Sequence, residues 1–207
     1  MSHLKLTYFD VHGGRAEAIR LALHLGGVAF EDFRFPFPKF ADVRKTTPFG
    51  QVPTLMVDDV QVTQCDSILR YAGRLANLYP ADPFQALLCD EVMYVVEEAS
   101  VKLGPTFHMT GDVQKAARLA LVNGSMPQYL AWLQQQLQAH GGEYFADQRL
   151  TVADLKVFVD VRALNSGWLD HVPTDLVQTV APLLNAHLQR IAQNPAVLAY
   201  YAKFAAK

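Results

Sequence analysis

Hydrophobic and polar residues change their spacing several times in the first eighty residues of the chain. They alternate in LKLTYFDV, residues 4–11, which is typical of a half-buried strand. From residue 15 to residue 27 the apolar residues follow helical spacing, and two glycines end the predicted helix. The inner face of this helix is predicted to carry Ala16, Ile19 and Leu23.

The rest of this half repeats the two patterns. Residues 29–35 form a second strand-like run, and residues 37–50 combine a short helix with a loop. Two strands around an Asp-Asp turn are predicted over residues 52–63. The right-handed crossover rule makes the first two strands parallel, and the tight turn makes the last two antiparallel. A helix within residues 65–79 follows, and its predicted inward residues are Ile68, Leu69, Ala72 and Leu75.

A segment with two prolines, PADPF at residues 80–84, separates this half from a second one. The pattern therefore predicts an α/β N-terminal part followed by an all-α C-terminal part. Within the second part, TVAD at residues 151–154 has the form of a capping box with Asp in place of the usual Glu or Gln. This motif is a folding signal, and no chemistry is assigned to it. The predicted helices of the second part cover about 84–109, 113–139, 151–168, 174–192 and 195–205.

The composition fits a globular protein and narrows the function classes. Of the 207 residues, 51% are hydrophobic and 18% are charged, and the formal net charge is -2. The charges form no long block of one sign, which gives no basis for a nucleic-acid or anionic-membrane partner. No apolar run has the length of a membrane span, and the first residues do not resemble a signal peptide. Cys65 and Cys89 form no metal-binding or redox spacing, so we expect no metal and a reduced, cytoplasmic setting.

Two segments could bind a ligand through the backbone. In GQVPTL, residues 50–55, a cis bond before Pro53 would turn the backbone of Val52 toward an extended ligand, and the alternative is an ordinary trans proline. In QCDSIL, residues 64–69, a helix begins where free amides and the helix dipole favour an anion. Gln64 would add a side-chain donor there and Cys65 a backbone donor, and the alternative is a helix that caps its own amides.

A tyrosine and an arginine flank the first turn. Tyr8 stands where the first strand ends, and its alternative role is packing. Arg15 stands at the predicted start of the first helix, where the helix dipole disfavours a cation, and therefore indicates an anion or a salt bridge with Glu17 or Asp10. Strand ends and helix starts thus converge at one edge of a small α/β sheet, which is where ligands bind in such folds.

These motifs resemble those of the cytosolic glutathione transferases of the tyrosine type, with features of the sigma and pi classes. The resemblance rests on YFDVHGGRAEAIR, PFGQVPTL, QCDSILRYAGRL and TVAD, and it runs almost from end to end. It implies a thioredoxin-like α/β N-terminal domain over residues 1–79 and an all-α domain over residues 84–207. It also implies a homodimer that conjugates glutathione, as co-substrate, to small hydrophobic electrophiles in detoxification.

The resemblance further implies a role for each matching residue. Tyr8 would be the catalytic hydroxyl that stabilises the glutathione thiolate, and Arg15 would support it electrostatically. The backbone of Val52, before a cis Pro53, would pair with the peptide part of glutathione. Its two ends would be held by the remaining binding residues: Phe40, Arg44 and Gln51 at the glycyl end, and Gln64, Cys65 and Glu98 of the partner subunit at the γ-glutamyl end. The electrophile site would be lined by Phe9, Val11, His108 and Tyr200 or Phe204.

The chain departs from the family pattern at several of these positions. Cys65 stands where Ser is usual, and a thiol is a weak donor. Phe40 stands where sigma-like enzymes often have Trp, and Arg44 could compensate for the lost donor. Glu98 is one methylene longer than the more familiar Asp, and the turn DVHGGRAE is one residue longer than the commonest form. Together these departures predict weaker affinity for glutathione.

Two alternatives to conjugation keep the same fold. One is a glutathione-dependent isomerase of the prostaglandin D synthase kind, which the sequence does not separate from a conjugating enzyme. The other is a non-catalytic ligand carrier, against which intact Tyr8 and Arg15 argue. A thiol-disulfide oxidoreductase is disfavoured because no cysteine stands at the end of the first strand. His108 could act as a general acid or could be a solvated residue at a helix end.

Overall fold

The computed structural model describes residues 2–204, which form a mixed four-stranded sheet followed by helices. The spatial order of the strands is β2-β1-β3-β4. Strand β1 pairs parallel with β2, whereas the β1–β3 and β3–β4 pairs are antiparallel, which confirms the predicted directions. The described residues exclude residue 1 and residues 205–207. The outer ends of the two expected domains therefore lie outside the described residues, and so does the last residue of the helix predicted over 195–205. The strands are β1 (Leu4–Phe9), β2 (Glu31–Phe35), β3 (Thr54–Val57) and β4 (Val60–Val62).

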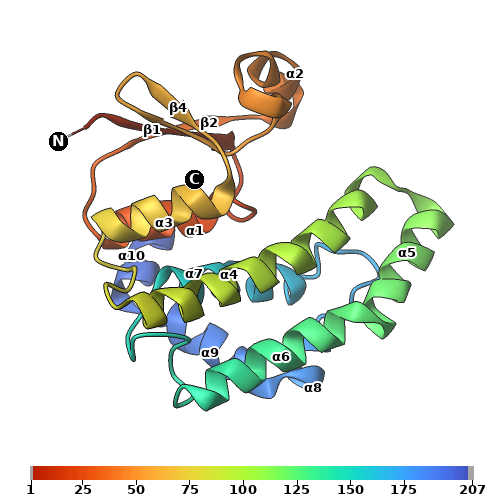
Figure 1. Ribbon diagram of the computed structural model, residues 1–207. Helices are drawn as coiled ribbons and strands as arrows, with labels where there is room; N and C mark the ends of the chain where they lie inside the picture. The colour runs from red at the N-terminus through yellow and green to blue at the C-terminus, as the bar shows by residue number, and fades with distance from the viewer. Residues whose placement is uncertain (1, 205–207) are drawn as a thin grey trace.

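Helices cover both faces of the sheet. Helices α1 (Glu17–Leu25) and α3 (Cys65–Leu75) lie side by side on the face that points toward the helical half, and α2 (Phe40–Val43) lies beyond the other face (Figure 1). The predicted inner residues of α1 are fully buried. The prediction for α3 is wrong at Leu75, which is 45% exposed because it lies in the last turn, where the helix no longer faces the core. The segment around α2 also contains the 3-10 helices η1 (Phe37–Lys39), η2 (Arg44–Thr46) and η3 (Pro48–Gly50).

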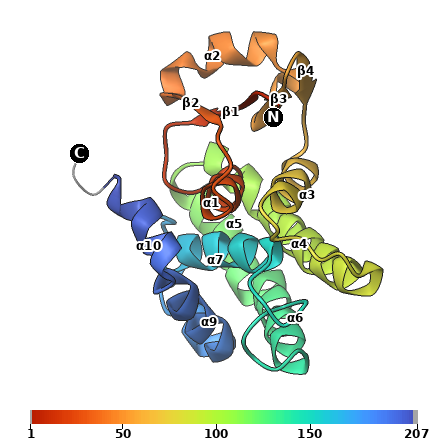
Figure 2. The same cartoon turned by 90° about the vertical axis from the view of Figure 1, so that its left-hand side faces the viewer.

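The second half of the chain is helical, and α7 runs through its centre (Figure 2). Helix α7 packs against α4 and α9 and also against α1 of the first half, and most of its residues are buried. Among residues 2–204, no helix combines the length and the apolar composition that a membrane crossing requires. The helices are α4 (Pro83–Leu103), η4 (Gly104–His108), α5 (Gly111–Asn123), α6 (Ser125–Ala139), α7 (Val152–Leu164), α8 (Leu176–Val180), α9 (Pro182–Ala192) and α10 (Pro195–Ala202).

Two segments that were each predicted as one helix are divided. The helix expected over 113–139 breaks at Gly124, whose backbone leaves the helical region with φ -119° and ψ -102°. The helix expected over 174–192 breaks at Ala181, directly before Pro182, which has no N–H to continue the hydrogen-bond ladder. The apolar spacing continues across both breaks, so the period alone did not reveal them.

The predicted capping box is present and has a structural role. The backbone N–H of Thr151 donates to Oδ2 of Asp154 over 2.8 Å, and both residues are fully buried. The other carboxylate oxygen of Asp154 accepts from the backbone N–H of Phe145 (3.1 Å) and pairs with Nε2 of His187 (3.0 Å). Asp154 thus ties the start of α7 to α9 and to the loop that precedes α7, which explains why an acid is buried there.

Candidate functional site

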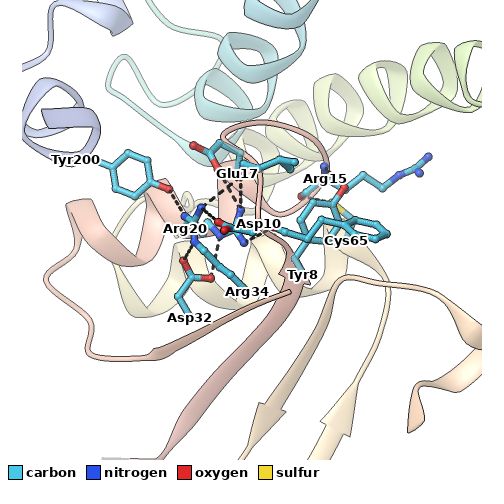
Figure 3. Close-up of polar contacts among 11 residues, drawn as sticks. Tyr8, Asp10, Arg15, Glu17, Arg20, Asp32, Arg34, Cys65 and Tyr200 are labelled. Atoms are coloured by element: carbon cyan, nitrogen blue, oxygen red, sulfur yellow. Dashed lines mark hydrogen bonds and ion pairs between the residues drawn. The ribbon is translucent and has the colours of Figure 1, made fainter. Parts of the chain in front are cut away.

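The side chain of Tyr8 lies at the end of β1 on the strand's buried face, and it is 8% exposed. Its hydroxyl oxygen accepts a hydrogen bond from the backbone N–H of Arg15 over 3.1 Å (Figure 3). Because this bond uses a lone pair of the oxygen, the hydroxyl proton stays available for donation to another group. The turn before α1 approaches the Tyr8 side chain most closely at Gly14, which has φ +67°. A Cβ added at Gly14 would lie 2.6 Å from the Tyr8 hydroxyl oxygen.

The surroundings of Tyr8 keep its phenol protonated. Burial raises the pKa of Tyr8 above its ordinary value, and the backbone N–H of Arg15 with the charges of Arg15 and Arg20 opposes this only in part. Near neutral pH the side chain is therefore a neutral hydrogen-bond donor. A neutral donor of this kind stabilises an anion, such as a thiolate, more than the corresponding thiol.

Arg15 lies in the turn before α1 and not in the helix. Helix α1 begins at Glu17, so the dipole argument that singled out Arg15 does not apply, and the predicted partners Asp10 and Glu17 are wrong. Glu17 pairs with Arg20 instead. The guanidinium of Arg15 binds Oε1 of Glu97 on α4 through Nε (3.1 Å) and Nη2 (3.0 Å). The Arg15 turn is thereby attached to the helical half of the chain.

The start of α3 meets the same turn. Gln64, the residue before the helix, is exposed and has φ 72°, a left-handed value that is uncommon for a residue other than glycine. The Sγ–H of Cys65 donates to the backbone carbonyl of Arg15 over 3.0 Å, and burial raises the pKa of this thiol to about 12. Cys65 is therefore a neutral thiol that fixes the turn, and the structure brings Tyr8, Arg15 and Cys65 together (Figure 3).

The segment from α2 to β3 holds the other residues that the resemblance assigned to glutathione. The Val52–Pro53 peptide bond is cis, and Pro53 is buried. The β1–β3 ladder begins with the pair Thr7 and Thr54, so Val52 and the exposed Gln51 lie beyond its paired part.

The side chains of Arg44 and Phe40 pack against each other in the same segment. The guanidinium carbon of Arg44 lies 5.5 Å from the ring centroid of Phe40. An added Cβ on Gly50 would lie 3.2 Å from Nε of Arg44, so the guanidinium rests against that glycine. Arg44 is nevertheless exposed, and this leaves a cation on the surface beside Phe40.

The residues predicted to line an electrophile site have different surroundings. The ring of Phe9 packs in an aromatic cluster with Phe35, Phe37 and Phe40 at centroid distances of 4.6–5.0 Å. Val11 is half-buried, and its backbone carbonyl accepts from arginines of α1 and β2. His108 is exposed at the end of η4.

Tyr200, which is also predicted to line this site, lies in a buried position next to Arg34. Tyr200 is 4% exposed, and its hydroxyl oxygen lies 3.4 Å from Nη2 of Arg34. Figure 3 shows it across the Arg20–Arg34 cluster from Tyr8. Tyr200 thus packs the last helix onto the N-terminal half, and its ring is also in contact with Phe204.

Glu97, the partner of Arg15, is absent from the residues predicted from the sequence, in which Glu98 has a different role toward the partner subunit. The buried residues of α4 include Met93 and Val96, and Glu97 follows Met93 by four positions, which places it beside the buried face. Glu98 lies one step further around the helix, where it is exposed and accepts a hydrogen bond from the Tyr129 hydroxyl over 2.6 Å. The helical period of α4 could therefore have indicated that Glu97 faces the inside of the same chain.

Comparison with known proteins gives matches over most of the chain. The family model described as "Glutathione S-transferase, N-terminal domain" matches residues 4–74, and the one described as "Glutathione S-transferase, C-terminal domain" matches residues 101–204. The chain is 33% identical to Glutathione S-transferase 1 of Ascaris suum over 91% of its own length and 87% of that protein. It is 30% identical to hematopoietic prostaglandin D synthase of Gallus gallus, covering 98% of this chain and 97% of that protein. The solved structure of prostaglandin synthase D of Nilaparvata lugens has a TM-score of 0.86 at 27% identity, covering 97% and 98% of the two chains.

Proposed function

Since the chain belongs to the glutathione S-transferase family of enzymes, we propose that Tyr8 is the residue that activates glutathione as a thiolate. Glutathione S-transferase activity, with glutathione as co-substrate, is the function of the family. A free thiol has a pKa of about 8.5 and is only a few per cent thiolate at neutral pH. The observation that carries the proposal is the backbone N–H of Arg15 bound to the Tyr8 oxygen, because it leaves the phenol proton free for the sulfur.

The rest of the glutathione molecule would be held at the two ends of the site. Arg44, an exposed cation beside Phe40, suits the glycyl carboxylate, and Gln51 lies in the adjoining segment. Val52, outside the sheet ladder and before Pro53, offers its backbone to the peptide part.

The first turn of α3 would take the γ-glutamyl carboxylate. Gln64 is exposed and could donate from its side chain, and the amide of Cys65 lies at the positive end of the helix. The Sγ–H of Cys65 already donates to the backbone carbonyl of Arg15. The backbone N–H of Cys65 therefore has to supply the contact with the γ-glutamyl carboxylate. Glu98 of the partner subunit is proposed for the γ-glutamyl amine, and its exposed position is compatible with this.

A homodimer is proposed because the single chain exposes large apolar side chains on η3 and along α4. Phe49 in η3 is 78% exposed, and α4 exposes Leu87, Tyr94 and Val101 at 61%, 51% and 56%. Such side chains are typical of an interface between subunits. Sedimentation equilibrium of the native chain tests this directly. A mass of twice 23.0 kDa supports the dimer, and a mass of 23.0 kDa at micromolar concentration rejects it.

The electrophile would bind beside Tyr8, with contacts from Phe9, Val11 and His108. A role in detoxification and a cytoplasmic location are proposed with it, since both cysteines are free thiols. The relatives also include prostaglandin D synthases, so a glutathione-dependent isomerase remains the second candidate. Measuring the isomerisation of a prostaglandin endoperoxide by the wild-type chain, beside its conjugation of glutathione, would separate the two activities.

The first experiment measures glutathione conjugation to chlorodinitrobenzene by the wild type and by Tyr8→Phe. Tyr79→Phe is the matched control, because Tyr79 is also 8% exposed but its hydroxyl donates to Asp90, away from the Arg15 turn. We expect Tyr8→Phe to lose tenfold or more in kcat/KM, about 1.4 kcal/mol of barrier, and Tyr79→Phe to stay within a factor of two to three of the wild type. An unchanged Tyr8→Phe would assign Tyr8 to packing, and an inactive wild type that binds glutathione would favour the carrier.

A further inference from the structure

Lys156 is a buried lysine in the middle of α7, where its neighbours along the chain are apolar. Its exposed fraction is 4%. The ammonium donates to Oδ1 of Asp66 in the first turn of α3 and to Oε2 of Glu97 on α4, the second over 3.1 Å. Three helices from both halves of the chain therefore meet at one buried positive charge.

This ammonium stays charged in its buried position. Burial acts to lower the pKa of Lys156, but the attraction of the carboxylates of Asp66 and Glu97 outweighs it, and the pKa is raised. The potential ligand atoms of Cys65, Asp66 and Glu97 all lie within 4.8 Å of one another. Two carboxylates at this separation would repel each other strongly without a cation between them, so the arrangement depends on Lys156.

Each of the two carboxylates serves a different part of the proposed glutathione site. Asp66 directly follows Cys65, whose amide is proposed to take the γ-glutamyl carboxylate. Glu97 uses its other oxygen to hold the guanidinium of Arg15, and the backbone N–H of Arg15 donates to the Tyr8 hydroxyl. A continuous path of contacts thus runs from Lys156 through Glu97 and Arg15 to Tyr8.

We propose that Lys156 is a positioning residue for the conjugation reaction. Its charge neutralises Asp66 next to the proposed site of the γ-glutamyl carboxylate. It also holds Glu97, so that Arg15 keeps its backbone hydrogen bond to the Tyr8 hydroxyl. This rests on the proposed role of Tyr8. With Lys156 present, the formal charges of Arg15, Asp66, Glu97 and Lys156 cancel. Without it a net negative charge remains beside two negative groups of the ligand, the γ-glutamyl carboxylate and the thiolate, and both are destabilised.

The remaining titratable groups around Lys156 do not replace its charge. The thiol of Cys65, with its pKa raised to about 12 by burial, is neutral near pH 7. Asp160 follows Lys156 by one helical turn on α7 and accepts a hydrogen bond from Ser100, and burial raises its pKa to about 6. Asp160 is therefore mostly ionised above neutral pH and adds negative charge, which makes the cation at position 156 more important.

The test compares Lys156→Met, which keeps an unbranched apolar stem of similar length, with Lys156→Arg, which keeps the charge. Lys115→Met on the exposed face of α5 is the matched control for loss of a lysine. For each protein we would measure thermal unfolding, KM for glutathione and kcat with chlorodinitrobenzene. The pKa of bound glutathione would be followed by the ultraviolet absorbance of its thiolate.

We expect Lys156→Met to raise KM for glutathione about tenfold, a change of 1.4 kcal/mol, and to raise the pKa of the bound thiol by roughly one unit. Lys156→Arg should recover most of both effects, and Lys115→Met should show neither. A merely structural role for Lys156 would lower the unfolding temperature and leave the bound-thiol pKa unchanged. A folded Lys156→Met with wild-type KM and wild-type thiol pKa overturns the inference.

A second comparison covers the case in which Lys156→Met does not fold. In Asp66→Asn the repulsion between the two acids is removed, so Asp66→Asn and the double variant Asp66→Asn/Lys156→Met should both fold. Within this background, loss of Lys156 should still raise the bound-thiol pKa, and equal values in the two proteins overturn the inference. The proposed function fails separately if the wild type does not lower the thiol pKa of glutathione or if Tyr8→Phe leaves it unchanged.

Discussion

Replacing Gly14 by alanine tests whether the turn before α1 sets the position of the Tyr8 hydroxyl. Gly14 has φ +67°, and an added Cβ would lie 2.6 Å from the hydroxyl oxygen of Tyr8 and 3.3 Å from its ring. The neighbouring Gly13 has no atom within 4 Å of an added Cβ. Gly14→Ala and Gly13→Ala therefore add the same methyl group at adjacent positions, but only the methyl group at position 14 would collide with Tyr8.

The structure gives the size of the perturbation. Real Cβ atoms stay beyond 3.0 Å from such neighbours, so the hydroxyl or the turn has to move by at least about 0.4 Å. A left-handed backbone costs an alanine about 1–2 kcal/mol, which should appear as lost stability. Since a misplacement of 1 Å at a reacting centre can cost about a hundredfold in rate, we expect Gly14→Ala to lose roughly tenfold in kcat/KM, about 1.4 kcal/mol.

The assay combines conjugation kinetics with the pKa of bound glutathione, both at a temperature where all variants are folded. Gly14→Ala should move the bound-thiol pKa toward the value of Tyr8→Phe, whereas Gly13→Ala should keep the wild-type value. The reasoning would be refuted by a folded Gly14→Ala that matches Gly13→Ala in both measurements, because the methyl group would then have displaced nothing that matters to the thiolate.

Two further predictions concern stability and assembly. Burial raises the pKa of Asp160 from 3.8 to about 6, so the folded chain binds this proton more tightly and gains stability at acidic pH that is lost as pH rises through 6. Urea unfolding at pH 4.5 and 7.5 should therefore show the free energy of unfolding of Asp160→Asn rising relative to that of the wild type by about 2 kcal/mol at the higher pH, since a pKa of about 6 lies about 1.5 units above pH 4.5. A difference that stays constant between the two pH values would contradict this. Phe49→Ser should lower the mass in sedimentation from dimer toward monomer, whereas Leu198→Ser, which removes a 49% exposed side chain on α10, should not. A Phe49→Ser variant that sediments like the wild type would remove Phe49 from the interface.

The sequence was informative wherever a local rule applied. Alternation predicted β1, and its buried residues Leu4, Leu6 and Tyr8 follow that alternation. The capping box at Thr151 was visible because its two partners are three residues apart. Breaks such as the one at Gly124 were missed because apolar spacing reports which face is buried and does not report the backbone angles that end a helix.

Contacts within the candidate site follow no local rule. Arg15 and Glu97 are 82 residues apart in the chain, and Lys156 and Asp66 are 90 apart. The short-range partners considered for Arg15 were wrong because a guanidinium at the surface of one half can reach an acid on the other. Family resemblance did not supply these pairs either, since it transfers roles only to positions that match a motif, and Lys156 lies outside the four motifs that carry the resemblance.

A signal for Lys156 was nevertheless present in the sequence. The run LTVADLKVFVDV, residues 150–161, is apolar on all sides apart from its charged residues, and a helix that is hydrophobic all round is buried. A lysine inside a buried helix has to be paired, because an isolated ammonium in the interior costs several kcal/mol. The helical half contributes that ammonium and one of its two acids, and the N-terminal half contributes the other acid together with Arg15 and Tyr8. Variants of Lys156 should for this reason couple to Glu97 and Asp66 in double-mutant cycles and be additive with a distant change such as Lys115→Met.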